Sequence, residues 1–305
     1  AVITHAHSDH ARAGHRAVLA TPETLALMRA RMDAALDAST LEPLPYGEPC
    51  VIGGITLRLV PAGHVLGSAQ VVLEGQGRRV VASGDYKRQP DPTCAPFRPV
   101  PCDLFVSEAT FGLPVFHHPD PASEIARLLE SLALFPRRPH LVGCYSLGKC
   151  QRLIAMLRAA GWDRPIYLHG AHASLCRAYE ALGVALGDLR PLATKKEALS
   201  GAIVLAPPAA AGTPWARRLG DPVICLASGW MRVRQRAKAR GVELPLVISD
   251  HADWDALLAT CSASGAGEVW VTHGREEALI HALAKAGIHG RALSLVGYDE
   301  AGSGE

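Results

Sequence analysis

The chain has 305 residues, 49% of them hydrophobic, and a formal net charge of +2. This length predicts about two domains with a sizeable core. The small net charge argues against a protein that holds nucleic acid by bulk positive charge, but it does not exclude a local basic cleft. No apolar run approaches the roughly 18 residues of a membrane-spanning helix, and no signal peptide is recognisable, so we expect neither.

The eight cysteines are scattered along the chain, and none forms a Cys-x-x-Cys pair. A disulfide framework is not typical of a chain this long, so we expect reduced, largely buried thiols in a cytoplasmic protein. The sequence starts at Ala1 rather than Met, inside a run that favours a strand. We therefore expect the N-terminal strands of the fold to be missing from this sequence.

The first third of the chain is predicted to be rich in strands. One helix is expected over residues 21–35, because Thr21 can cap it, Pro22 suits its first position and Glu23 its first turn. The predicted strands cover residues 51–60, as a hairpin that turns at two glycines, and residues 70–73, 79–82 and 104–107.

After Pro114 the pattern changes to alternating helices and strands. The predicted helices cover residues 120–134, 149–160, 171–182, 231–239, 254–262 and 276–286. The predicted strands cover residues 140–143, 165–168, 202–206, 223–227, 244–249 and 268–272. Alternation at this spacing is typical of βαβ units that build a parallel sheet.

Four potential metal ligands, His5, His7, Asp9 and His10, lie within six residues near the N-terminus. They follow the strand-forming run 1–4, and alternate residues of a strand share one face, so His5 and His7 can bind one cation together. A turn after the strand can direct Asp9 and His10 toward a second cation. Imidazole and carboxylate groups suit zinc, manganese or iron. The alternative is a polar loop that happens to be rich in histidine.

Five further titratable residues stand at the C-terminal ends of predicted strands: His64, Asp85, Glu108, His251 and His273. Functional side chains often lie on loops that a rigid sheet holds in place. Taken singly, each of these residues could be a helix cap or a hydrogen-bonded turn residue. Their joint order along the chain is the stronger signal.

This order resembles the β-CASP branch of the metallo-β-lactamase superfamily, a group of nucleases. Segments 61–70, 83–88, 109–114 and 248–254 are similar in particular to the bacterial DNA ligase-associated exonucleases. The resemblance implies an α/β fold, an αββα metallo-β-lactamase sandwich with an inserted domain. The sandwich would comprise residues 1–114 and 244–305, and the α/β β-CASP insertion residues 115–243.

The resemblance also implies a set of ligands for two divalent metal ions, zinc or manganese. The first ion would be bound by His5, His7 and His64. The second would be bound by Asp9, His10 and His273. Asp85 would bridge the two ions.

The resemblance further implies that Glu108 supports His251, which would face the scissile phosphate. Two adjacent divalent ions suit phosphodiester hydrolysis, because they make hydroxide accessible near neutral pH and bind phosphate oxygens. Asp9 could steer the nucleophile, and His251 could orient the phosphate or protonate the leaving 3′-oxygen.

The predicted function is a two-metal-dependent DNA exonuclease in DNA repair, a metal-dependent phosphodiesterase. Its predicted partners are a single-stranded or end-containing DNA substrate and, through functional association, a DNA ligase and a helicase. Two alternatives stay open. One is an RNA endonuclease or exonuclease of the same branch, and the other is a non-catalytic scaffold that binds nucleic acid.

Residues 143–150 nearly match the phosphate-binding motif G-x-x-x-x-G-K-[S/T]. The last position is Cys150, a poor magnesium ligand, so we do not expect ATP binding. A helix N-terminus offers free N–H groups and a positive dipole end, so Ser146 and Lys149 are predicted to hold a DNA phosphate. The alternative is a tight turn with a solvated lysine. A basic cluster at 232–240 and the neighbouring Trp230 are further candidates for nucleic-acid contact. The alternatives are a solvated surface for the basic cluster and a place in the core for Trp230.

Overall fold

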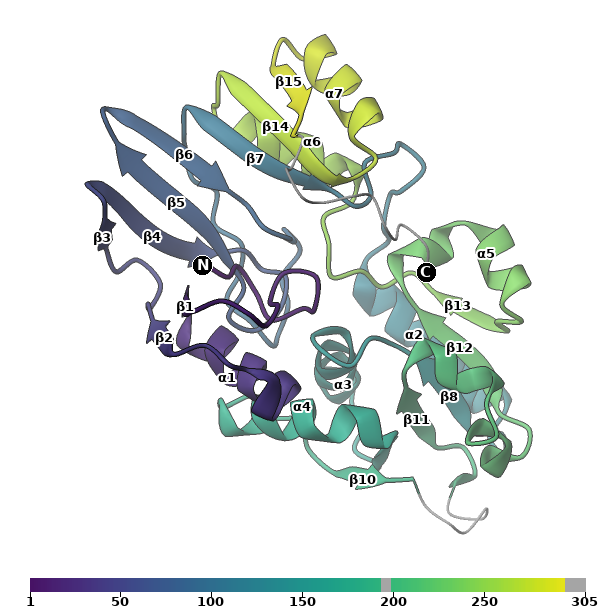
Figure 1. Cartoon of the computed structure of the whole chain (residues 1–305). Helices are drawn as coiled ribbons and strands as arrows, with labels where there is room; N and C mark the ends of the chain where they lie inside the picture. Colours follow the sequence, from purple (N-terminus) through teal and green to yellow (C-terminus); the bar gives the residue numbers. More distant parts are fainter. Residues whose placement is uncertain (193–198, 294–305) are drawn as a thin grey trace.

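The computed structural model describes residues 1–192 and 199–293. Two sheets dominate these residues (Figure 1), and a small two-stranded sheet accompanies them. The seven-stranded sheet draws on the first and last parts of the chain, and the six-stranded sheet on the middle. No helix among the described residues combines the length and the apolar character needed to cross a bilayer.

The seven-stranded sheet has the order β15-β14-β7-β6-β5-β4-β3. Its strands are β3 (Cys50–Ile52), β4 (Ile55–Pro61), β5 (Ala69–Gly75), β6 (Arg78–Ala82), β7 (Leu104–Ala109), β14 (Glu268–Gly274) and β15 (His289–Ala292). Strands β3 to β6 pair antiparallel, whereas β6, β7, β14 and β15 pair parallel. Helices α6 (Trp254–Ala263) and α7 (Glu276–Lys285) pack on its parallel half, where Phe105, Val271 and Leu257 are buried in one core.

The six-stranded sheet is parallel throughout, with the order β10-β9-β11-β8-β12-β13. Its strands are β8 (His140–Gly143), β9 (Ile166–Leu168), β10 (Leu189–Pro191), β11 (Ile203–Ala206), β12 (Val223–Ala227) and β13 (Leu244–Leu246). Its helices are α2 (Pro121–Leu134), α3 (Lys149–Ala159), α4 (Gly170–Ala181) and α5 (Arg234–Ala239). The alternation of helices and strands after Pro114 thus builds a parallel sheet as far as β13, whereas α6, β14 and α7 belong to the seven-stranded sheet.

The N-terminal segment joins the two sheets. Strands β1 (Ala17–Ala20) and β2 (Thr40–Pro43) pair parallel, and helix α1 (Pro22–Met32) lies between them in the chain. Thr21 caps α1, because its hydroxyl accepts a hydrogen bond from Thr24 N at 3.2 Å. Helix α1 packs against α4 of the middle part of the chain. Short 3₁₀ helices are η1 (Asp33–Ala35), η3 (Pro208–Gly212), η4 (Ala216–Leu219) and η5 (Gly229–Arg232).

Several boundaries differ from those expected. The run 1–4 is not a regular strand, because it contributes only an isolated bridge between Val2 and Leu19. The helix expected over 231–239 is divided by the extended Val233 into η5 and α5. The strand expected over 244–249 ends at Leu246, and it belongs to the six-stranded sheet. The division of the chain at 114 and 243 stays a prediction, and residues 294–305 of its last part lie outside the described structure.

Candidate metal centre

A turn, rather than a strand, gathers the N-terminal histidines. The backbone N–H groups of His10 and Ala11 both bond to the carbonyl of His7, at 3.2 and 2.8 Å. This turn brings the ring centroids of His5 and His10 to 4.2 Å, and those of His5 and His7 to 4.8 Å. The predicted proximity of these residues is present, although its predicted cause, the shared face of a strand, is wrong.

The first ligand group comprises His5, His7, His64 and Asp85, whose ligand atoms lie within 4.8 Å of one another. His64 follows β4, and its Nδ1 donates to the carbonyl of Asp250 at 2.8 Å. That bond leaves Nε2 as the nitrogen that faces His7 Nδ1, at 3.1 Å. A partner on the outer nitrogen is the usual way to orient a metal-binding imidazole.

The second ligand group comprises Asp9, His10 and His273, again with ligand atoms within 4.8 Å of one another. Asp9 Oδ2 lies 3.7 Å from His10 Nε2 and 3.8 Å from His273 Nε2. His273 has φ 57°, and the pairing of β14 with β7 shifts between Thr272 and Gly274. This irregularity places the imidazole at the end of the strand, in a group more exposed than the first.

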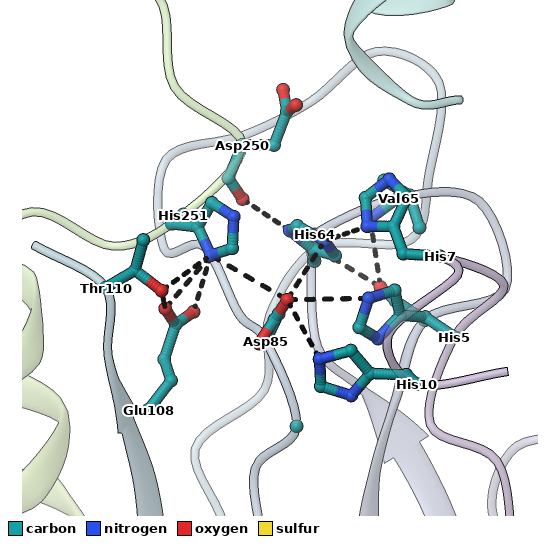
Figure 2. A network of polar contacts seen from close by, with 12 residues as sticks. His5, His7, His10, His64, Val65, Asp85, Glu108, Thr110, Asp250 and His251 are labelled. Atoms are coloured by element: carbon teal, nitrogen blue, oxygen red, sulfur yellow. Dashed lines mark hydrogen bonds and ion pairs between the residues drawn. The ribbon is translucent and has the colours of Figure 1, made fainter. Parts of the chain in front are cut away.

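Asp85 contacts a histidine of each group, and Figure 2 shows its carboxylate joined to His5 and to His10. Its Oδ2 is 3.4 Å from His5 Nε2 and 3.4 Å from His10 Nε2. Burial opposes ionisation, but the charges of His10 and His251 hold the pKa of Asp85 well below its usual range. A buried carboxylate shared by two sets of ligands is suited to bridge two cations.

The donor set fits divalent cations. Among the described residues, the buried Nε2 of His5 and Oδ1 of Asp85 have no hydrogen-bond partner. Unpaired buried polar atoms are costly, and a bound cation would satisfy both of these atoms. Burial also lowers the pKa of His5 and His64 well below the usual range, which keeps both imidazoles neutral and able to coordinate.

His251 and Glu108 form a third group beside Asp85 (Figure 2). His251 Nδ1 lies 2.9 Å from Glu108 Oε2 and 3.9 Å from Asp85 Oδ2. Glu108 is itself fixed, because its Oε1 accepts from Tyr86 N at 2.7 Å and its Oε2 accepts from the Thr110 hydroxyl. Burial opposes protonation of His251, but the carboxylates of Glu108 and Asp85 raise its pKa to about 9.

The phosphate contact predicted for Ser146 and Lys149 stays a prediction, and the structure gives both side chains partners within the protein. Lys149 is only 3% exposed, and its Nζ lies 2.9 Å from Asp250 Oδ2 and 3.2 Å from the carbonyl of Ile248. The Ser146 hydroxyl is paired with His172 Nδ1 at 2.8 Å. Both groups therefore have partners inside the protein, and Lys149 acts as a structural counter-ion.

The main residue that sequence reasoning missed is Asp250. Its carbonyl orients His64, and its carboxylate pairs with Lys149 and, at 3.6 Å, with Arg152 Nη1. Asp250 directly precedes His251, and this acidic neighbour is a signal that could have drawn attention to it. Its two basic partners come from α3, which no local pattern around residue 250 reveals.

Comparisons with known proteins agree with this geometry. Residues 1–136 match the model of the metallo-beta-lactamase superfamily. A protein named probable DNA ligase from Opitutus terrae is 32% identical, over 95% of this chain but 28% of that protein. A ribonuclease of Thermus thermophilus is also 32% identical, over 55% of this chain and 45% of that protein. This chain thus spans less than half the length of either relative.

A solved structure, that of a protein of unknown function from Enterococcus faecalis, covers 97% of this chain and 79% of its own, with a TM-score of 0.63. At 13% identity, this likeness shows the fold alone. Fold and site together define a protein of the metallo-β-lactamase class with clustered histidine and carboxylate groups that could hold metal ions. The match of residues 1–136 assigns this part of the chain to the metallo-beta-lactamase superfamily.

Proposed function

We propose that this chain is a two-metal-dependent DNA exonuclease that hydrolyses phosphodiester bonds in DNA repair. The observation that carries the proposal is the position of Asp85, whose Oδ2 lies 3.4 Å from an imidazole of each ligand group. Two adjacent cation positions with a shared carboxylate suit an in-line displacement at phosphorus. The choice of DNA is supported by the relative named a probable DNA ligase, which aligns with 95% of this chain.

In the proposed reaction the ligand groups would hold two divalent ions, zinc or manganese. When bound, such ions lower the pKa of water and neutralise charge on phosphate oxygens. Asp9 belongs to the more exposed group, and we assign its carboxylate to orient the attacking water. His251 binds Glu108 through Nδ1, so its Nε2 is the nitrogen available to a phosphate oxygen or to the leaving 3′-oxygen.

The wider setting is part of the same proposal. The Opitutus relative carries its match to this chain within a longer protein named a probable DNA ligase. This supports functional association of the exonuclease with a DNA ligase. We further propose an association with a helicase and a cytoplasmic location. An RNA nuclease is the second candidate, because relatives from Thermus thermophilus and Emericella nidulans are named as a ribonuclease and an endoribonuclease.

The test is hydrolysis of end-labelled DNA and RNA strands of one sequence by the full-length protein, with manganese or zinc. We expect DNA to be degraded faster than RNA, with short products released from one end. His10→Ala is expected to abolish hydrolysis, and His15→Ala, which removes an exposed histidine nearby, is the matched control. Faster hydrolysis of RNA would favour the second candidate. Metal-loaded protein that hydrolyses neither strand would support a non-catalytic scaffold.

A further inference from the structure

A further group of metal-ligating side chains lies beside the six-stranded sheet, separate from the seven ligands above. The ligand atoms of Cys144, Cys150 and His172 lie within 4.8 Å of one another. Cys144 follows β8, Cys150 lies in the first turn of α3, and His172 lies in the first turn of α4. All three side chains are 0% exposed, so the group is closed to solvent.

His172 is oriented as a ligand would be. Its Nδ1 is paired with the Ser146 hydroxyl at 2.8 Å, while its Nε2 lies 3.8 Å from the sulfur of Cys144. An imidazole that binds a metal through one nitrogen usually donates its other N–H to a nearby oxygen. The Ser146 hydroxyl can accept that hydrogen and leave the Nε2 lone pair directed at the thiols.

A third thiol, that of Cys176, lies beside this group, outside the set whose ligand atoms all lie within 4.8 Å of one another. Cys176 follows His172 by four residues in α4, so the two side chains share one face of the helix. Gln151, the residue after Cys150, donates from its Nε2 to the Cys176 sulfur at 3.4 Å. The thiol of Cys176 is 2% exposed. Three thiols and one imidazole in a closed setting are the ligands of structural zinc sites, and they disfavour magnesium or calcium.

We propose that Cys144, Cys150, Cys176 and His172 bind a structural zinc ion that fastens the end of β8 to the first turns of α3 and α4. Binding would deprotonate the three thiols and release their protons to solvent. This proposal is independent of the nuclease activity, because none of its ligands belongs to the histidine and carboxylate centre.

A zinc ion at this site would also stabilise the histidine and carboxylate centre. The ligands Cys144 and Cys150 bracket the turn that contains Leu147, and the carbonyl of Leu147 accepts from His7 Nε2 at 3.1 Å. That bond leaves His7 Nδ1 as the nitrogen that faces His64. A zinc ion bound to Cys144 and Cys150 would thus fix the position of the Leu147 carbonyl. That carbonyl sets the tautomer of His7, a predicted ligand of the catalytic metal ions.

Cobalt(II) is the probe that separates the two metal centres. Only thiolate ligands give cobalt an intense charge-transfer band in the near ultraviolet, and the histidine and carboxylate centre has no sulfur. The reduced full-length protein, stripped of metal and titrated with cobalt(II), is expected to show this band and to bind one equivalent more than Cys150→Ser. The matched control is Cys225→Ser, which removes a buried thiol of the same sheet and should keep the band.

A second variant covers the case in which Cys150→Ser does not fold. His172→Gln keeps all three thiols, and it is expected to shift the cobalt spectrum and weaken binding at this site alone. Asp85→Asn is expected to leave the thiolate band unchanged. Folded wild-type protein that binds cobalt without a thiolate band would overturn the proposal. So would a native Cys144–Cys150 disulfide in protein purified under reducing conditions.

Discussion

At the scale of single residues, the contact between Glu108 and His251 is expected to influence how kcat depends on pH. The Glu108 carboxylate, with that of Asp85, raises the pKa of His251 to about 9 against the opposing effect of burial. Glu108→Gln removes one of these charges, so the imidazolium should lose its proton at a lower pH. We expect the alkaline limb of the pH–kcat profile to move to lower pH.

The measurement is the rate of DNA hydrolysis between pH 6 and 9, with the exposed Glu130→Gln as control. Loss of activity in Glu108→Gln should be larger at pH 8 than at pH 6. An equal loss at every pH would contradict a role through the protonation of His251.

A second residue-scale prediction concerns stability. His118 is half-buried, with its ring against that of Phe111, and desolvation lowers its pKa to about 4. Histidine in an unfolded chain titrates near 6.5. Between about pH 6.5 and 4 the unfolded state therefore binds a proton that the folded state does not, and the free energy of unfolding falls as pH falls.

His118→Leu removes the imidazole that binds this proton. The free energy of unfolding of the variant should therefore fall less than that of the wild type as the pH is lowered. Urea unfolding at pH 7 and pH 4.5 measures the difference, and the buried histidines are common to both proteins. His281→Leu, at an exposed position, should behave like the wild type. Parallel pH dependence in wild type and His118→Leu would show that the half-buried imidazole is not neutral.

At the scale of elements, the first turns of α3 hold the loop that carries His251. Lys149 pairs with Asp250 at 2.9 Å, and both side chains are almost fully buried. Removing one partner of a buried ion pair leaves an uncompensated charge, which costs on the order of 3 kcal/mol. Lys149→Met is therefore expected to lower the free energy of unfolding by about that amount and to reduce kcat.

The same variant distinguishes the structural role from the phosphate contact that the motif predicted. A structural counter-ion affects stability and kcat, whereas a phosphate contact affects mainly KM for DNA. Lys238→Met, which removes an exposed lysine of α5, controls for loss of general positive charge. A rise in KM alone, with unchanged stability, would support the phosphate contact.

Sequence patterns predicted most elements because the buried strands are short apolar runs between helices. Strands β1, β2, β10 and β15 were not predicted. Of these, β10 and β15 lie at sheet edges, and segments such as His289–Ala292 offer no apolar alternation. The break at Val233 interrupts a basic stretch whose composition favours a continuous helix. The ligand residues could be named from their order, but the roles of Asp250 and Lys149 depend on a contact between distant segments.

At the scale of the whole molecule, the two sheets meet at the metal centre. The loop after β8 reaches this centre through the Leu147 carbonyl on His7, and helix α3 reaches it through Lys149 and Arg152 on Asp250. Helices α1 and α4 pack together beside these contacts. The middle part of the chain therefore orients two histidines of the centre, in addition to any contact it makes with substrate.

We propose that the two ligand groups, with the shared Asp85, hold the divalent ions at which DNA is hydrolysed. The most direct test of this proposal is a paired measurement of metal content and DNA hydrolysis in Asp85→Asn, with the exposed Asp163→Asn as control. Because Oδ2 of Asp85 faces both groups, the variant should lose two metal equivalents relative to the wild type. The rate of hydrolysis should fall by more than about 100-fold. Losing a residue that only supports a ligand costs up to about 100-fold, and Asp85 is proposed as a ligand itself. An Asp85→Asn protein that keeps the metal content and the activity of the wild type would contradict the account.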